Sequence, residues 1–100
     1  MANPIEKLDK AFNNKIRLGI MSALAVNEFL DFKALKNLLE VTDGNLASHS
    51  SALEKLNYIQ IEKSFIGKKP NTKYIITTIG KKAFNQHLSG LAEILKSTSM

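Results

Sequence analysis

The side chains best suited to chemistry in this sequence lie on one predicted helix, at residues 43–56. If the apolar Leu46 and Leu53 face inward, the opposite face carries an amide, a hydroxyl, an imidazole and one methyl group. Such short side chains let a helix enter the DNA major groove, where an amide pairs with adenine and a methyl contacts thymine. An ordinary solvated surface would show the same pattern. The candidate DNA-contacting residues of this helix are Thr42, Gly44, Asn45, Ser48, His49 and Ala52.

A second group of reactive side chains is a run of lysines in a predicted β-hairpin. Six lysines against Glu62 alone give residues 58–82 a net charge of +5, and since the whole chain carries +5, the remainder sums to zero. Contacts to phosphates require such a concentration of charge. Lysines also protect exposed hairpin edges from aggregation, but that role does not require Gly67-Lys68-Lys69-Pro70 at the tip. The lysines expected to contact DNA are Lys63, Lys68, Lys69 and Lys73.

The composition excludes several classes of function. The chain has no cysteine, which rules out a disulfide scaffold, a cysteine nucleophile and a thiolate metal site. His49 and His87 lie on separate predicted helices, and no phosphate-cradling glycine loop or serine elbow is present. We therefore expect no enzyme activity, no metal and no cofactor. The uncharged stretch at residues 18–27 is about half the length of a membrane-spanning helix, so we expect a cytoplasmic protein without membrane contact.

Helical periodicity predicts the elements that position these groups. Asn3 with Pro4, Asp31 and Thr42 are expected to cap helices, and residues 28–30 form a turn or a short edge strand. The short turn between the helices capped by Asp31 and Thr42 predicts a helix-turn-helix. The expected helices cover about residues 4–12, 15–26, 31–40, 43–56 and 78–96. Their expected inward-facing leucines include Leu35, Leu38, Leu39, Leu46, Leu53 and Leu56.

A β-hairpin is expected to follow the helix-turn-helix. Ile59, Ile61 and Phe65 lie an even number of residues apart and predict a half-buried strand. Residues 67–71 form a cluster of turn residues, and residues 73–78 predict the second strand. The last helix has an apolar stripe made up of Ile79, Ala83, Leu88, Leu91, Ile94 and Leu95.

The order of these elements and two sequence blocks resemble the small single-domain MarR/ArsR-like winged helix-turn-helix transcriptional regulators. The first block is Thr42-Asp43-Gly44-Asn45-Leu46-Ala47-Ser48-His49, and the second is Pro70-Asn71-Thr72-Lys73-Tyr74. The resemblance implies an α+β, mostly α, fold in one domain of residues 1–100. Its three-helix core and two-stranded wing would occupy about residues 14–88, and terminal helices at about 4–12 and 78–96 would serve dimerisation.

The resemblance also implies a function, a bacterial or archaeal transcription regulator at the nucleoid. It would be a homodimeric repressor that binds double-stranded DNA at a pseudo-palindromic operator. The predicted helix at residues 43–56 would lie in the major groove, and Lys68 and Lys69 would reach the minor groove or its phosphates. Two features depart from the family pattern: Ser50 replaces a usually buried leucine, and lysines replace arginines, which read groove shape better. The main alternative is a winged-helix module that presents its hairpin to a partner protein. The sequence does not identify a small-molecule effector.

Homodimerisation has a basis in the terminal segments, which are more apolar than the core of one small chain can cover. The alternative is that these residues simply close the core of the single chain. The expected interface residues are Ile5, Leu8, Phe12, Ile16, Phe84, Leu88, Leu91 and Leu95.

Overall fold

The structure, a computed structural model, describes residues 3–97 and contains within them four α-helices, two 3-10 helices and a three-stranded antiparallel sheet. The predicted α+β, mostly helical winged helix-turn-helix is confirmed. The predicted domain of residues 1–100 extends beyond the described residues at both ends. In chain order the elements are η1 (Pro4–Lys7), η2 (Lys10–Phe12), α1 (Lys15–Ala25), β1 (Leu30–Asp31), α2 (Phe32–Leu39), α3 (Asp43–Lys55), β2 (Ile59–Ile66), β3 (Lys69–Ile76) and α4 (Thr78–Ser97).

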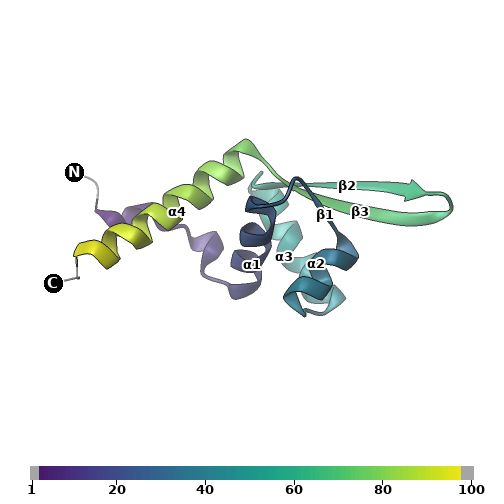
Figure 1. Ribbon diagram of the computed structural model, residues 1–100, viewed down its shortest axis with the longest axis horizontal. Helices are drawn as coiled ribbons and strands as arrows, with labels where there is room; N and C mark the ends of the chain where they lie inside the picture. Colours follow the sequence, from purple (N-terminus) through teal and green to yellow (C-terminus); the bar gives the residue numbers. More distant parts are fainter. Residues whose placement is uncertain (1–2, 98–100) are drawn as a thin grey trace.

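The molecule is elongated, with a central body and two arms (Figure 1). Its principal extents are 57 × 24 × 20 Å. Helices α1, α2 and α3 form the body, and the β2–β3 hairpin extends from it in one direction. Helix α4 extends in the opposite direction with η1 packed alongside it. We refer to the hairpin as the wing and to α4 with η1 as the terminal arm.

The hydrophobic core lies where α1, α2 and α3 meet the base of the wing. Leu35 is the one fully buried residue of α2, and Leu39 beside it is half-buried. The expectation that Leu38 and Leu56 are buried is wrong, because they are 60% and 48% exposed. Leu38 is turned about 100° from Leu39 around the helix axis, and Leu56 lies beyond the last turn of α3. The side chains that are less than 2% exposed are Ile20, Met21, Leu24, Leu35, Leu46, Ser50, Leu53 and Ile59.

Local side-chain caps define the helix-turn-helix. The Asp31 carboxylate accepts a hydrogen bond from the Ala34 N–H at 2.8 Å, and the Thr42 hydroxyl accepts one from the Asn45 N–H at 3.1 Å. Both predicted caps are therefore confirmed. The turn itself places Glu40 in the left-handed region at φ 52°. An exposed ion pair of 2.6 Å between Lys36 and Asp43 also joins α2 to α3.

The N-terminal segment forms two 3-10 turns, so the predicted helix at residues 4–12 is wrong. Asp9 separates the two turns because its N–H and its carboxylate form hydrogen bonds outside a helical pattern. Its N–H donates to Nδ1 of His87 at 3.0 Å, and its carboxylate accepts from the Ala11 N–H at 2.9 Å and the Tyr58 hydroxyl at 2.5 Å. The hydrogen bond to Asp9, followed by burial and the Asp9 charge, raises the pKa of Tyr58 to about 12. The long-range bonds to His87 and Tyr58 replace the backbone bonds of a continuous helix.

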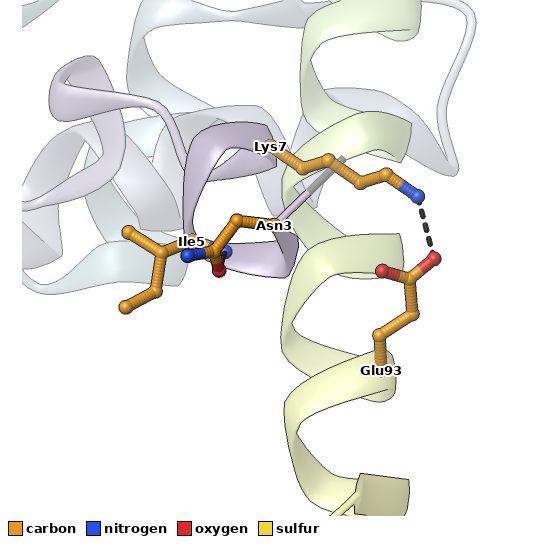
Figure 2. A network of polar contacts seen from close by, with 4 residues as sticks. All are labelled: Asn3, Ile5, Lys7 and Glu93. Atoms are coloured by element: carbon orange, nitrogen blue, oxygen red, sulfur yellow. Dashed lines mark hydrogen bonds and ion pairs between the residues drawn. The ribbon is translucent and has the colours of Figure 1, made fainter. Parts of the chain in front are cut away.

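Helix α4 packs against the rest of the chain through a narrow face that is separate from its apolar stripe. Gly80, Phe84, His87 and Gly90 are its buried positions, whereas the stripe members Ile79, Leu88, Leu91 and Leu95 are 58%, 44%, 40% and 71% exposed. A Cβ on Gly90 would lie 2.8 Å from the Pro4 carbonyl oxygen. Figure 2 shows how η1 lies against α4 there, with Lys7 reaching Glu93 in an ion pair of 2.5 Å.

The wing is a longer hairpin than the sequence predicts. Its register runs from Ile59 opposite Ile76 to Ile66 opposite Lys69, which leaves a two-residue loop instead of the predicted turn at residues 67–71. Gly67 adopts φ 65° at the first loop position, as a type II′ turn requires. Strand β1 pairs with β3 only at Leu30 and Asp31, so Pro70 lies where β3 has an open edge and needs no N–H.

Gly80 supports a test of the close contact between α4 and Tyr58. A Cβ at position 80 would lie 2.0 Å from the Tyr58 carbonyl oxygen, so Gly80→Ala must push α4 away from the body. We expect this variant to lose about 2–4 kcal/mol of unfolding free energy in urea denaturation. Gly44→Ala is the control, because nothing lies within 4 Å of its added Cβ, and it should gain about 0.5–1 kcal/mol. Equal stabilities of the two variants would contradict this packing.

Candidate nucleic-acid interface

The outer face of α3 is open to solvent at the positions where the sequence predicts DNA contacts. Thr42, Gly44, Asn45 and Ser48 are exposed. The inner face is fixed by Leu46, Ser50 and Leu53, which are buried. Because the buried residues anchor one side of α3, the short polar residues on the other side remain available to a ligand.

Ser50, which stands where the family usually has a buried leucine, is itself buried. Its hydroxyl donates to the Ala47 carbonyl at 3.2 Å, so the buried polar group is satisfied within the helix. Burial raises the pKa of the neighbouring Tyr74 phenol, and a hydrogen bond with Ser50 acts in the opposite direction. Ser50 thus joins α3 to the base of the wing through a polar contact where a leucine would give an apolar one.

His49 is half-buried and held in place by Arg17 of α1. The Arg17 guanidinium lies with Nη1 3.1 Å from His49 Nδ1, and its Nε donates to the Ala11 carbonyl at 2.7 Å. Because arginine can only donate, Nδ1 accepts and the ring proton of neutral His49 lies on Nε2. His49 therefore offers a donor, which suits guanine or phosphate oxygens. Arg17, the only arginine in the chain, is not among the residues predicted from the sequence.

The wing lysines differ in their surroundings. Residues 62–70 are all exposed, and they include Lys63, Lys68 and Lys69. Lys68 lies in the two-residue loop at the tip, next to Lys69 at the start of β3. Lys73 is half-buried at the base of the wing, where its Nζ lies 4.4 Å from the centroid of the Phe29 ring. Lys73 is thus engaged in a cation–π contact, and the other three are the freely projecting cations.

A cleft of about 410 Å³ lies between α3 and the wing. Ala47, Ser51 and Glu54 of α3 line one side, and Lys63 and Thr72 of the wing line the other. None of the predicted α3 residues lines it, which applies to Gly44, Asn45, Ser48, His49 and Ala52. The cleft residues Ala47, Ser51 and Thr72 are not among the residues predicted from the sequence. The spacing of four between positions 47 and 51 places both on the face next to Ser48, and this could have revealed them.

The predicted interface residues of the terminal segments fall into two groups. Phe12 and Phe84 are only 4% and 5% exposed, and their rings meet edge to face with centroids 5.6 Å apart. These two close the core of the single chain and offer no surface to a partner. Leu8 and Ile16 are half-buried. The exposed members are Ile5, Leu88, Leu91 and Leu95.

Two classes of site find no support in the part of the chain that the structure describes. No cluster of three or more histidine, aspartate or glutamate side chains there could hold a metal ion. Among residues 3–97, no helix combines the length and the apolar character needed to span a membrane.

Comparisons with known proteins agree with this geometry. The family model described as a winged helix DNA-binding domain matches residues 16–95. The uncharacterized protein MJ0432 of Methanocaldococcus jannaschii is 33% identical over 88 residues, which are 88% of this chain and 96% of the relative. A transcriptional regulator homologue from Pyrococcus horikoshii OT3 superposes with a TM-score of 0.87 at 28% identity, over 99% of this chain and 100% of the other.

A more distant structure shares the fold alone. Sco3205, a MarR family transcriptional regulator from Streptomyces coelicolor solved in complex with DNA, superposes with a TM-score of 0.68 at 17% identity. The match covers 97% of this chain and 67% of that protein.

The contact between Arg17 and His49 predicts a defined ring tautomer. At a pH of about 8, where a histidine ring is ordinarily neutral, nitrogen NMR should show His49 protonated at Nε2 and accepting at Nδ1. Arg17→Met should remove the donor and let both tautomers populate. His87 is the internal control, because its Nδ1 accepts from the Asp9 N–H in both proteins. An unchanged His49 spectrum in the variant would contradict the assigned contact.

Proposed function

The chain belongs to the family of winged helix DNA-binding domains, and from this premise we propose that it is a sequence-specific transcriptional regulator of double-stranded DNA. This family consists of DNA-binding domains and not of enzymes. One observation carries the proposal: α3, whose outer polar residues are exposed, and the cationic wing form the two sides of one cleft. A duplex that fills this arrangement would meet a reading surface and a phosphate-binding surface together.

In this proposal α3 is the recognition helix and lies in the major groove. Asn45 and Ser48 are exposed and short enough to approach base edges. His49 adds an Nε2–H donor at the edge of the same face. Ala52 is half-buried beside His49 and offers only a methyl contact. Thr42 and Gly44 at the helix start would contact a phosphate through the free N–H groups of the first turn.

The wing supplies most of the affinity in this proposal. Lys63, Lys68 and Lys69 are exposed, and each phosphate contact releases counterions from the duplex. Lys73 contributes charge at the base of the wing, while its ammonium remains over the Phe29 ring. Ser51 is added to the predicted set, because it lines the cleft between α3 and the wing.

The terminal arm is the proposed homodimer interface. Leu88, Leu91 and Leu95 are exposed on α4, and Ile5 is exposed on η1. Figure 2 shows the Ile5 side chain on the side of η1 that faces away from α4. A two-fold pairing of these arms would place two recognition helices about one helical turn, roughly 34 Å, apart on a pseudo-palindromic operator.

The regulatory role follows from where such a dimer would sit. A dimer bound across a promoter blocks access of the transcription machinery, so repression is the simplest outcome. The name of the Pyrococcus horikoshii relative, a transcriptional regulator homologue, supports a regulatory role, and the DNA complex of the Streptomyces coelicolor protein supports the duplex as the ligand. A chromosomal target would place the protein in the cytoplasm at the nucleoid of a prokaryotic cell.

Charge removal at the tip tests the proposed phosphate contacts. Lys68→Ala with Lys69→Ala should weaken binding to all duplexes alike and reduce the salt slope of the binding constant by about two. Fluorescence anisotropy titrations across a range of salt concentrations measure both. Lys10→Ala with Lys96→Ala is the matched control, since it removes the same charge from exposed positions on the terminal segments. A tip variant whose salt slope equals that of the control would refute the assignment.

Charge insertion tests the proposed dimer. Leu88→Glu with Leu91→Glu should convert a dimer into a monomer in analytical ultracentrifugation, because two carboxylates per chain would be desolvated at the interface. The matched control is Val26→Glu with Ile79→Glu, at positions that are 81% and 58% exposed and outside the proposed interface. If both variants keep the association state of the parent protein, the interface lies elsewhere.

A further inference from the structure

The tip of the wing carries two large apolar side chains that contribute nothing to the core. Phe65 is 73% exposed and Ile66 is 66% exposed, although the alternation of strand β2 predicts Phe65 to be half-buried. Phe65 lies opposite Pro70 in the hairpin register, and Pro70 is exposed as well. Neighbouring strand residues point to opposite faces, so the tip is apolar on both faces of the ribbon.

These side chains are held far from the body. The buried and half-buried part of β2 ends at Ile61, and every residue from Glu62 to Pro70 is exposed. A strand rises about 3.3 Å per residue, so Ile66 stands roughly 16 Å beyond Ile61. The DNA minor groove is about 7.5 Å deep. The free part of the wing is therefore long enough to reach the floor of that groove.

The positive charge around the apolar tip favours a polyanion as its binding partner. Lys63, Lys68 and Lys69 surround Phe65 and Ile66 along the exposed hairpin. The single acid of the hairpin, Glu62, lies opposite Lys73 near the base. Two such tips from two copies of the chain would repel each other, so a second copy does not fit this surface.

The tip is thicker than an undistorted minor groove is wide. A β-ribbon with side chains on both faces is about 10 Å thick, whereas an undistorted minor groove is only about 6 Å wide. Apolar side chains in the minor groove enter between base pairs, unstack them and kink the duplex toward the major groove. Phe65 and Ile66 have the size and position for that insertion.

We propose that the wing tip inserts Phe65 and Ile66 as an apolar wedge into the minor groove and bends the operator. This inference rests on the proposed binding of duplex DNA and adds an architectural activity to it. The bend would make binding sensitive to flexible steps such as TA at positions that no side chain reads. It would offset the weak groove reading of lysines that stand where related wings have arginines.

The test combines a bend measurement with a probe of base stacking. The ligand is a duplex of about 30 base pairs with a TA step at its centre, a fluorophore at each end, and 2-aminopurine at that step in a second version. The parent protein should shorten the end-to-end distance by a bend of about 20–90° and raise 2-aminopurine fluorescence. Phe65→Ser with Ile66→Ser should still bind with an unchanged salt slope, but leave the duplex straight and stacked.

Val26→Ser with Ile79→Ser is the matched control, which removes two exposed apolar side chains away from the tip and should bend DNA as the parent does. Equal bending by the tip variant would overturn the wedge while leaving the proposed DNA binding intact. Absence of duplex binding by the parent protein would overturn both. Tip-dependent binding to vesicles of anionic lipid, without tip-dependent bending of DNA, would also overturn the wedge and assign the tip to a membrane surface.

Discussion

The junction at Tyr58 fixes how the wing, the recognition helix and the terminal arm are placed relative to one another. Tyr58 lies in the short connection after α3 and immediately precedes β2. Its carbonyl accepts the Thr77 N–H at 3.0 Å, where β3 passes into α4, and its hydroxyl donates to Asp9 of the N-terminal segment. Gly80 allows α4 to approach the same carbonyl. Four parts of the chain thus meet at one residue, so the direction of the wing and that of α4 are set together.

A second feature of the molecule is that its net positive charge is concentrated in one part of the chain. Residues 58–82 carry the entire net charge of +5, while the rest of the chain is neutral. In the body, the exposed Asp43 at the start of α3 is paired with Lys36 at 2.6 Å, which limits its repulsion of a phosphate. The exposed lysines of the wing project away from the core, so their mutual repulsion destabilises the fold only a little. The same body can then hold α3 and the cationic wing on the two sides of one cleft.

Sequence reasoning succeeded where short-range physics decides the structure. Asp31 and Thr42 are caps whose partners lie three residues away. It failed where partners lie far apart in the chain. The bond from Asp9 to His87 spans 78 residues and broke the predicted first helix, and the contact of Arg17 with His49 spans 32. Periodicity also could not show that Gly80 and Gly90, and not the leucines, are buried on α4 beside Phe84 and His87, since close backbone approach leaves no apolar signal.

The central claim is that α3 and the wing contact adjacent grooves of one duplex. Because the chain has no cysteine, Ser48→Cys and Lys68→Cys can each carry a single iron chelate that cleaves nearby DNA. On a bound duplex the account predicts two separate cleavage centres per half-site, one from each position, about half a helical turn or roughly 5 base pairs apart. Cleavage from only one of the two positions, or centres that coincide, would contradict it.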